Sequence, residues 1–464
     1  MAMKDSGSPA TRGAVDHRPR QLNPMEQAMT RVFNGFPEVQ LNLNVRGTPR
    51  SATLVINERC AQLQRDGLPV YRLGLGQSPF PVPESVVEAL RANAHQKDYL
   101  PVQGLGLLRE VVAKRHRDAF GVDCSPDDVI VGPGSKELMF LLQLVYYGDL
   151  VVPTPAWVSY EPQARIIGRH VRHIATERAN GWRLSPDQLD QLCQLDPGRP
   201  RIVILNYPSN PTGTTYDQDE LEDLADTASR NRVVLLSDEI YGELHHQGAH
   251  RSVVPLYPQG TIYSSGLSKW CGAGGWRLGL FVVPRTMRWL LDAIAAAASE
   301  TYTSTSAPIQ YAAVRAFEGG AEIDRYLVRC RSILGALGRH LAATLREAGA
   351  QVFEPEGGFY LYPDFSAMRD GLASNGIVTS DDLCRRLLAE TGVAILPGTE
   401  FGRAPSELAA RLAYVDFDGS LALRRVAELS RDESPDEAFL RACCGPTMEA
   451  VDRLAEWVNG YGGK

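Results

Sequence analysis

The sequence of 464 residues lacks the patterns that mark several specialised classes of protein. No apolar run approaches the roughly 18 to 20 residues that span a bilayer, and the polar start of the chain, residues 1–24, lacks the apolar centre of a secretory signal. The eight cysteines include no Cys-x-x-Cys pair, which argues against a zinc or redox site. We therefore expect a soluble, cytoplasmic protein with reduced cysteines and no metal site.

An excess of positive charge is also missing. The chain has 48 Lys and Arg residues against 55 Asp and Glu residues, which gives a formal net charge of -7. A domain that binds nucleic acid normally carries a basic face, so nucleic acid is not an expected partner. Hydrophobic residues make up 44% of the chain and charged residues 22%, which is ordinary for a globular protein long enough to hold two cores.

Short apolar runs alternate with helical patterns through the middle of the chain. This alternation predicts βαβ units, and therefore an α/β fold with a mainly parallel sheet and helices on both faces. A long helical pattern from Ala321 to about Gly349 precedes an apolar segment at residues 357–362, where we expect the entry to a second, α+β domain. The expected strands are 128–131, 150–152, 201–205, 233–236, 261–263 and 280–283, and the expected helices include 52–66, 135–147, 218–229 and 447–458.

Lys269 lies in a Gly-rich stretch, residues 266–279, that connects two of these apolar runs. Glycines let the backbone approach a ligand closely, and an amine held there loses contact with water. Burial and the nearby Arg277 both lower the pKa of such an amine toward the free base, which can form an imine with an aldehyde cofactor. The alternative is a surface lysine with an ordinary ion-pair partner.

The stretch around Lys269, with Arg277 inside Gly-Trp-Arg-Leu-Gly, resembles the cofactor-attachment site of class I and II aminotransferases. These enzymes carry pyridoxal 5'-phosphate (PLP) on the fold called type I. The resemblance extends from about Tyr71 to about Phe417. It implies a mainly parallel seven-stranded sheet in a large domain, accompanied by a smaller α+β domain.

The expected domain boundaries follow from this resemblance and from the composition of the chain. Residues 85–320 are expected to form the large PLP-binding domain, and residues 51–84 and 321–464 the small one. Residues 1–50 are turn-rich and polar, which predicts a flexible extension or an arm on a partner subunit. A charged segment at 428–444 is expected to be an insertion before the last helix.

Asp238 closes a predicted strand, at the edge of a parallel sheet where ligands bind. The resemblance assigns Asp238 to the pyridine nitrogen of PLP, because a buried carboxylate keeps that nitrogen protonated and makes the ring an electron sink. It assigns Tyr241, and Asn210 of the Asn-Pro-Thr-Gly segment, to the phenolate oxygen of the cofactor. Without the resemblance, Asp238 would be a helix cap and Asn210 part of a turn.

A junction between a strand and a helix at residues 132–137 presents free backbone N–H groups and the positive end of the helix dipole, which together suit a phosphate. A plain helix cap by Ser135 is the alternative and is compatible with phosphate binding. Many relatives have a hydroxyl residue where this chain has Gly266, and Ser265 is the candidate to replace it. The resemblance assigns the phosphate to Gly134, Ser135, Lys136, Ser268 and Arg277.

Two aromatic residues complete the expected cofactor site. The resemblance places Trp157 against the pyridine ring, although a core position would also suit this side chain. Tyr99 lies in Tyr-x-Pro-x-x-Gly, a segment that in the family reaches the phosphate bound by the neighbouring subunit. The resemblance therefore implies a homodimer with shared active sites.

Arg411 matches the family's arginine for the substrate α-carboxylate, and its apolar neighbours fit a buried strand. Arg403 is the nearest competitor. Gln77 lies in a loop expected near the substrate, and Asn210 is expected to contact the substrate as well. The segment 300–308 lacks the arginine of dicarboxylate-specific relatives, so aspartate or glutamate is not the obvious amino donor.

The resemblance implies transamination of an amino acid to an oxo acid through a Lys269 Schiff base, removal of the α-proton and a quinonoid intermediate. Related PLP enzymes instead eliminate, replace or cyclise at the β or γ carbon, for example with S-adenosylmethionine, and the motifs do not separate these reactions. A third class, transcription regulators with an aminotransferase-like domain, needs a longer and basic N-terminal module than residues 1–50 provide.

Overall fold

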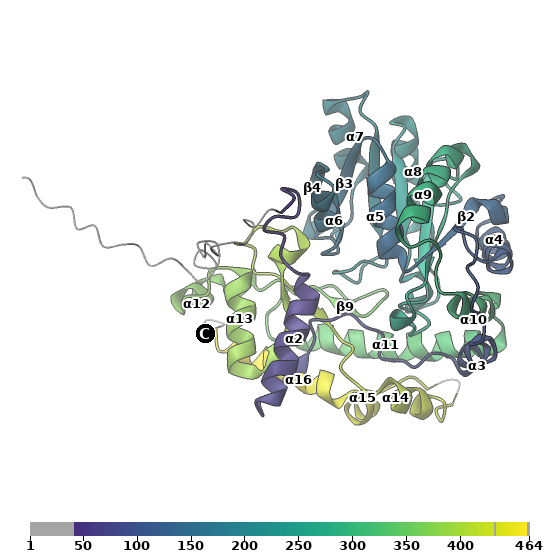
Figure 1. The fold of residues 1–464 in the computed structure, drawn as a ribbon. Coiled ribbons are helices and arrows are strands. Elements are labelled where there is room, and N and C mark those ends of the chain that lie inside the picture. The colour runs from purple at the N-terminus through teal and green to yellow at the C-terminus, as the bar shows by residue number, and fades with distance from the viewer. Residues whose placement is uncertain (1–40, 431–432, 462–464) are drawn as a thin grey trace, which may run out of the picture. The chain divides into compact units, whose positions relative to one another are not determined.

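The computed structural model describes residues 41–430 and 433–461 (Figure 1). Most of the predicted N-terminal extension lies outside the described residues. The chain divides after Arg46, and the helices and strands described below belong to the unit that begins at Gly47.

A seven-stranded sheet lies at the centre of this unit, in the strand order β2-β8-β7-β6-β5-β3-β4. All neighbouring strands are parallel except β8, which runs antiparallel to both β2 and β7. This confirms the predicted mainly parallel α/β sheet. The strands are β2 (Val129–Gly132), β3 (Asp149–Thr154), β4 (Val171–Ala175), β5 (Arg201–Asn206), β6 (Val234–Asp238), β7 (Thr261–Gly266) and β8 (Gly279–Val282).

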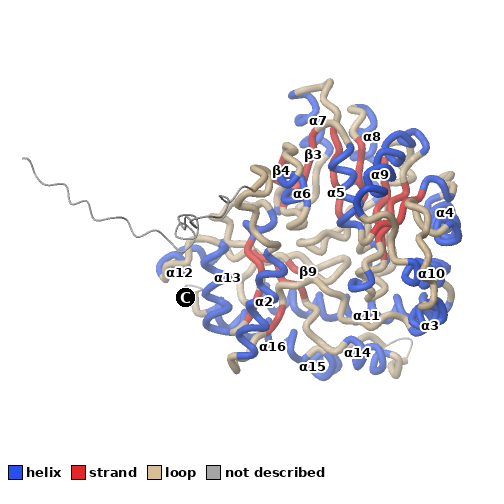
Figure 2. The backbone as a smooth tube through the Cα atoms, in the orientation of Figure 1, coloured by secondary structure: helices blue, strands red, loops and turns tan. Residues whose placement is uncertain are grey.

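Helices cover both faces of the sheet (Figure 2). Successive residues of a strand point to opposite faces, so Leu235 and Leu236 of β6 enter two different cores. The core around Leu236 contains side chains of α5 (Ser135–Val145), α6 (Tyr160–Ile166) and α9 (Arg288–Thr301), and the core around Leu235 those of α7 (Pro186–Leu195) and α8 (Gln218–Arg230). Three more helices lie near β2, which forms one edge of the sheet: α3 (Glu84–Asn93), α4 (Gly106–Phe120) and α10 (Ala307–Glu318).

The long helix α11 (Ala321–Glu347) follows, as its apolar periodicity predicts, and its buried face joins the largest core. Two small sheets accompany it, β11-β12-β9 and the parallel pair β1-β10. Their strands are β1 (Tyr71–Arg72), β9 (Tyr360–Leu361), β10 (Val393–Ala394), β11 (Leu396–Pro397) and β12 (Ala410–Ala413). The remaining helices are α2 (Ala52–Arg65), α12 (Arg369–Ser374), α13 (Ser380–Thr391), α14 (Gly419–Val426), α15 (Glu437–Cys443) and α16 (Gly445–Asn459).

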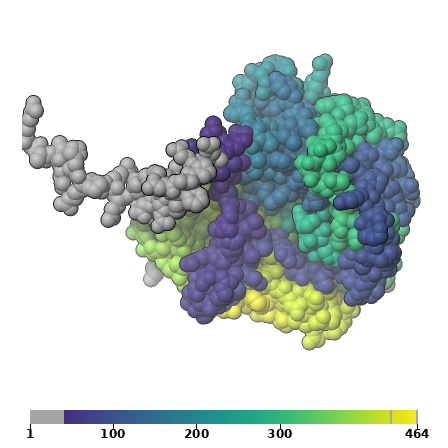
Figure 3. Space-filling model, viewed as in Figure 1, coloured from purple at the N-terminus to yellow at the C-terminus, as the bar shows by residue number. Residues whose placement is uncertain are grey.

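The pairing of Tyr71 with Val393 joins the early part of the chain to its C-terminal third. In Figure 3 the purple surface of α2 adjoins the yellow surface of the last helices. The arrangement agrees with the grouping of residues 51–84 with 321–464, although the domain boundaries stay a prediction. The segment 428–444 contains α15. Residues 431–432 of this segment lie outside the described residues.

All eight cysteines are buried and unpaired. Within the described residues, no helix combines the length and apolar character needed to cross a membrane.

Candidate active site

A cavity of about 500 Å³ opens beside the carboxyl ends of β5 and β6, where Asn206 and Asp238 end their strands. The loop after β1 and helix α2 supply part of its wall, through Thr53, Leu54 and Leu75. The structure brings eleven of the predicted site residues to this cavity: Gln77, Ser135, Lys136, Trp157, Asn210, Asp238, Tyr241, Ser268, Lys269, Arg277 and Arg411.

Lys269 projects into this cavity, and its Nζ atom donates a 2.6 Å hydrogen bond to the backbone carbonyl oxygen of Gly76. Burial lowers the pKa of Lys269 to about 7, and the positive charge of Arg411 acts in the same direction. Arg277, the cation expected from the sequence, contributes less than Arg411. Near neutral pH a large fraction of this amine is therefore an uncharged nucleophile.

Asp238 is 3% exposed and has two carboxylate oxygens in different situations. Its Oδ2 atom accepts a 2.6 Å hydrogen bond from the phenol of Tyr160, whereas Oδ1 is buried without a hydrogen-bond partner among the described residues. Burial raises the pKa of Asp238 to about 6, and the hydrogen bonds from Tyr160 and from the Ile240 N–H oppose that rise. Because a buried oxygen without a donor is costly, Oδ1 fits an N–H group of a ligand such as a protonated pyridine ring.

Arg411 is 1% exposed, and its hydrogen-bond partners are an amide and a carbonyl oxygen rather than a described carboxylate. Its Nη1 atom donates to Asn210 Oδ1 at 3.1 Å, its Nη2 atom donates to the Gly74 carbonyl oxygen, and its Nε atom has no partner in the described chain. A buried guanidinium without a counter-charge is costly, so an anionic ligand group would be stabilised here.

The competing arginine from the sequence, Arg403, is already fully engaged. It forms a salt bridge of 2.8 Å with Glu407 and donates to the carbonyl oxygens of Thr154 and Thr176. This geometry favours Arg411 over Arg403 as the group that binds a substrate carboxylate.

The start of α5 forms a cationic recess. Gly134 has a φ of 93°, and a Cβ atom at this position would lie 2.2 Å from Nη2 of Arg277. Lys136 places its Nζ atom 5.0 Å from the ring centroid of Trp157, and burial together with Arg277 lowers the pKa of Lys136. Neither Lys136 nor Arg277 forms an ion pair with a described carboxylate. Two such cations at a helix N-terminus suit the phosphate of PLP.

Two tyrosines of the site were not singled out from the sequence. Tyr160 contacts Asp238, and the hydroxyl groups of Tyr360 and Tyr241 lie 2.7 Å apart. Both occur in segments noted for other reasons, Tyr160 three residues after Trp157 and Tyr360 after the Gly357–Gly358 turn. A tyrosine among apolar residues has no pattern that distinguishes a site residue from a core residue, so only the fold identifies them.

Three predicted contacts lie elsewhere. Tyr99 is 90% exposed and does not line the cavity. Gly134 does not line the cavity, but a side chain at this position would collide with Arg277, which does. Ser265, the candidate replacement for a hydroxyl at Gly266, lines a different cavity.

The family model for aminotransferase class I and II matches residues 69–419, which is most of the chain. This protein belongs to that family. Its members depend on PLP, and the unpartnered Asp238 Oδ1 and the recess at Gly134 fit that cofactor. This aminotransferase is therefore a PLP-dependent transferase that acts on amino acids and oxo acids.

Several relatives support this assignment. An aspartate aminotransferase of Geobacillus stearothermophilus is 33% identical over 386 residues, which cover 81% of this chain and 94% of the relative. A probable aspartate/prephenate aminotransferase of Thermus aquaticus is 32% identical, with 84% and 98% covered. The solved structure of aspartate aminotransferase from Thermus thermophilus with maleate has a TM-score of 0.74 at 29% identity, again with 84% and 98% covered. Elimination, replacement and cyclisation are not favoured by these comparisons.

Proposed function

We propose that Lys269 is the amine that attaches PLP and that it then carries the proton taken from the substrate. The observation that supports this most directly is the presence, in one cavity, of an amine with a pKa of about 7 and a buried acid with a free oxygen. When bound, PLP supplies a ring that withdraws electrons from the α carbon of the substrate. Asp238 Oδ1 accepts the N–H of that ring and keeps its proton in place.

The other residues of the cavity hold and orient the two ligands. Arg411 binds the α-carboxylate with its guanidinium, while Asn210 and Tyr241 donate to the ring oxygen of the cofactor. Trp157 packs against the cofactor ring. The phosphate is held by the recess at the start of α5 and by the loop that carries the lysine, through Gly134, Ser135, Lys136, Ser268 and Arg277.

The amino donor to test first is aspartate, because similar proteins carry the names aspartate and aspartate/prephenate aminotransferase. No arginine occurs in residues 300–308, so a second carboxylate would have to be paired by a cation of the cavity itself. Besides Lys269 and Arg411, the cations that line the described cavity are Lys136 and Arg277, and both are assigned above to the phosphate. Gln77 lines the same cavity, which supports its proposed contact with the substrate.

Transamination is tested by adding single amino acids to the PLP-loaded enzyme and following both the cofactor absorbance and the oxo acid formed. The expected result is conversion to the amino form of the cofactor, with one oxo acid per site. A Lys269→Ala variant should lose the absorbance of the lysine-bound cofactor, whereas Lys114→Ala, at an exposed lysine paired with Asp118, should keep it. Release of ammonia without the amino form of the cofactor would contradict transamination.

We also propose that the enzyme is a homodimer in which Tyr99 reaches the phosphate site of the partner. The 90% exposure of this aromatic side chain is consistent with a contact made only in an assembly. Light scattering should give twice the chain mass of 50.9 kDa. A Tyr99→Phe variant should bind PLP more weakly, and unchanged PLP affinity would remove Tyr99 from the site.

A further inference from the structure

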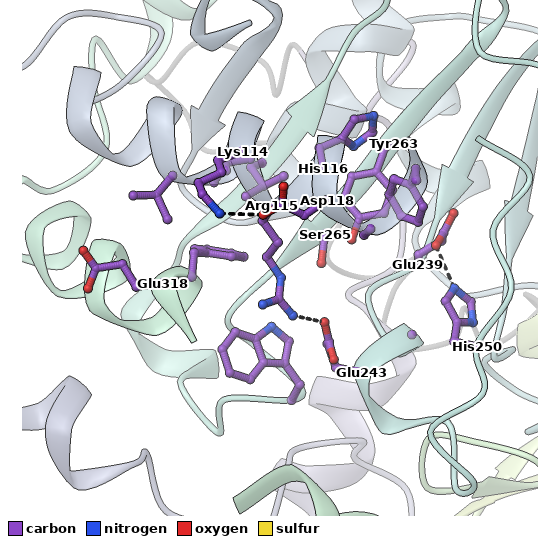
Figure 4. Close-up of a pocket in the computed structure, with 18 of the residues that line it drawn as sticks. Lys114, Arg115, His116, Asp118, Glu239, Glu243, His250, Tyr263, Ser265 and Glu318 are labelled. Atoms are coloured by element: carbon purple, nitrogen blue, oxygen red, sulfur yellow. Dashed lines mark hydrogen bonds and ion pairs between the residues drawn. The ribbon is translucent and has the colours of Figure 1, made fainter. Parts of the chain in front are cut away.

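A second cavity, of about 750 Å³, lies between α4, α11 and the turn Gly242–Leu244 (Figure 4). It shares no lining residue with the first cavity, where the PLP site is proposed and which is called the PLP cavity below. Its wall nevertheless includes Glu239 and Trp270, the chain neighbours of Asp238 and Lys269. A volume of this size is typical of sites for small molecules.

Two arginines from different helices meet in this cavity. Arg115 of α4 and Arg331 of α11 both pair with Glu243, Arg115 through Oε1 and Arg331 through Oε2 at 3.3 Å. Arg331 also donates from Nε to the Glu243 carbonyl oxygen at 2.8 Å. Two guanidinium groups share one carboxylate here, so the Arg115–Glu243–Arg331 cluster taken by itself carries one positive charge.

Arg115 retains most of its hydrogen-bonding capacity. A guanidinium has five N–H donors, and the bond to Glu243 is the one hydrogen bond of this side chain within the described residues. Its side chain is 38% exposed, and Figure 4 shows it extending from α4 across to Glu243. The unused donors are therefore accessible to a ligand.

Three further acids line the cavity, and within the described residues no hydrogen bond joins any of them to Arg115. Glu239 is already bound by Ser252 at 2.6 Å and by His250 at 2.7 Å. Asp118 pairs with Lys114 at 2.6 Å on the exposed side of α4. In Figure 4, Glu318 points away from Arg115.

Aromatic side chains supply the apolar part of the wall. Phe120 and Tyr263 meet edge to face with ring centroids 5.5 Å apart, and both are only partly buried. Trp270 and Phe317 form a second edge-to-face pair at 6.0 Å. Such a wall suits a flat ring, which packs against aromatic edges and faces.

We propose that this cavity binds a small aromatic carboxylate. The carboxylate is held by Arg115, with Arg331 and Glu243 fixing that guanidinium, and the ring lies against Phe120 and Tyr263. This site is separate from the PLP site and has no part in transamination itself.

The test is isothermal titration of the PLP-loaded enzyme with phenylacetate and with its uncharged analogue phenylacetamide. Phenylacetate should bind, and phenylacetamide should bind at least about tenfold more weakly, because it loses the charged contact. An Arg115→Gln variant should weaken phenylacetate binding by about the same factor. Arg91→Gln, at an exposed arginine of α3 paired with Glu84 and Glu88, should leave it unchanged.

Two further variants locate the bound probe. Phenylacetate binding at this cavity should persist in Arg411→Lys and weaken in Ala119→Trp, which obstructs the exposed wall without touching an ion pair. Binding that disappears in Arg411→Lys but is unchanged in Arg115→Gln and Ala119→Trp would place the probe in the PLP cavity and overturn the proposal. Absence of any binding to the unmodified enzyme at about 10 mM probe would overturn it as well.

Discussion

The phenol of Tyr160 donates a 2.6 Å hydrogen bond to Oδ2 of Asp238, and both side chains are buried. This bond orients the carboxylate so that its other oxygen remains free for a ligand. It also opposes the effect of burial, which raises the pKa of Asp238 to about 6. In the proposed site, Tyr160 therefore acts through Asp238, as a positioning residue.

Replacing Tyr160 with Phe is expected to lower kcat about 10- to 100-fold, because a hydrogen bond to a charged group contributes about 1.5 to 3 kcal/mol. The pKa of Asp238 should rise, so the acid limb of the pH profile of kcat should move to higher pH. Steady-state rates between pH 5 and 9 measure both effects. Tyr146→Phe, which removes a buried hydroxyl bonded to the Arg201 carbonyl oxygen, is the control. A kcat within twofold of the unmodified enzyme would contradict this role.

Uptake of PLP by the apoenzyme should depend on pH through Lys269. Since the pKa of this amine is about 7, the free-base fraction rises as pH rises through 7, and uptake should be about tenfold slower at pH 6 than at pH 8. Stopped-flow absorbance measures the rate. Arg411→Gln removes a charge that lowers this pKa, so its midpoint should move to higher pH, whereas Arg403→Gln should not shift it. A flat rate from pH 6 to pH 8 would refute this assignment.

A Gly134→Ala substitution should weaken PLP binding at least tenfold. The new Cβ atom would lie 2.2 Å from Arg277 Nη2 and displace that guanidinium from the recess. Gly121→Ala is the matched control, because Gly121 also has a positive φ, of 67°, but has no neighbouring atom within 4 Å of the new Cβ. Gly121 is in the left-handed α region and Gly134, with a ψ of 152°, is in a region that is essentially confined to glycine, so each variant should lose about 1 to 3 kcal/mol of folding stability from backbone strain. Equal PLP affinities in fluorescence titrations would show that the contact with Arg277 is unimportant.

Arg411→Lys should raise KM for the amino acid about 100-fold with a smaller effect on kcat. A lysine cannot reproduce the planar fork that contacts Asn210 and the Gly74 carbonyl oxygen while leaving donors for a carboxylate. Arg403→Lys should change stability rather than KM, because Arg403 is committed to Glu407 and two carbonyl groups. A larger KM effect at Arg403 would reverse the assignment.

Much of the central sheet could be predicted because its strands are continuous apolar runs. The six expected strands correspond to β2, β3, β5, β6, β7 and β8, each within a few residues. Strand β4 was not predicted, because its residues Arg172 and His173 are exposed at the sheet edge and break the apolar pattern. Four strands of the small sheets, β1, β9, β10 and β11, were not predicted for another reason, because they have two residues each, too few for any periodicity.

The residues that line the cavity could be predicted where they lie in contiguous motifs, but the contacts between them could not. Asp238 ends one apolar run, and Lys269 lies in the connection between two others. Such positions mark the edge of a parallel sheet. The strongest charge acting on Lys269, however, belongs to Arg411, which is distant in sequence and adjacent only in the fold. Likewise, the bond between Tyr160 and Asp238 joins residues 78 positions apart.

The parallel pairing of Tyr71 with Val393 has a consequence for synthesis of the protein on the ribosome. The loop that follows β1 carries the carbonyl groups of Gly74 and Gly76, which hold Arg411 and Lys269. A nascent chain can fold its central sheet once β8 has emerged, but β1 has no partner strand until residue 394 is made. A growing polypeptide therefore has no complete cavity, and nothing to retain a reactive aldehyde, until most of its length has been translated.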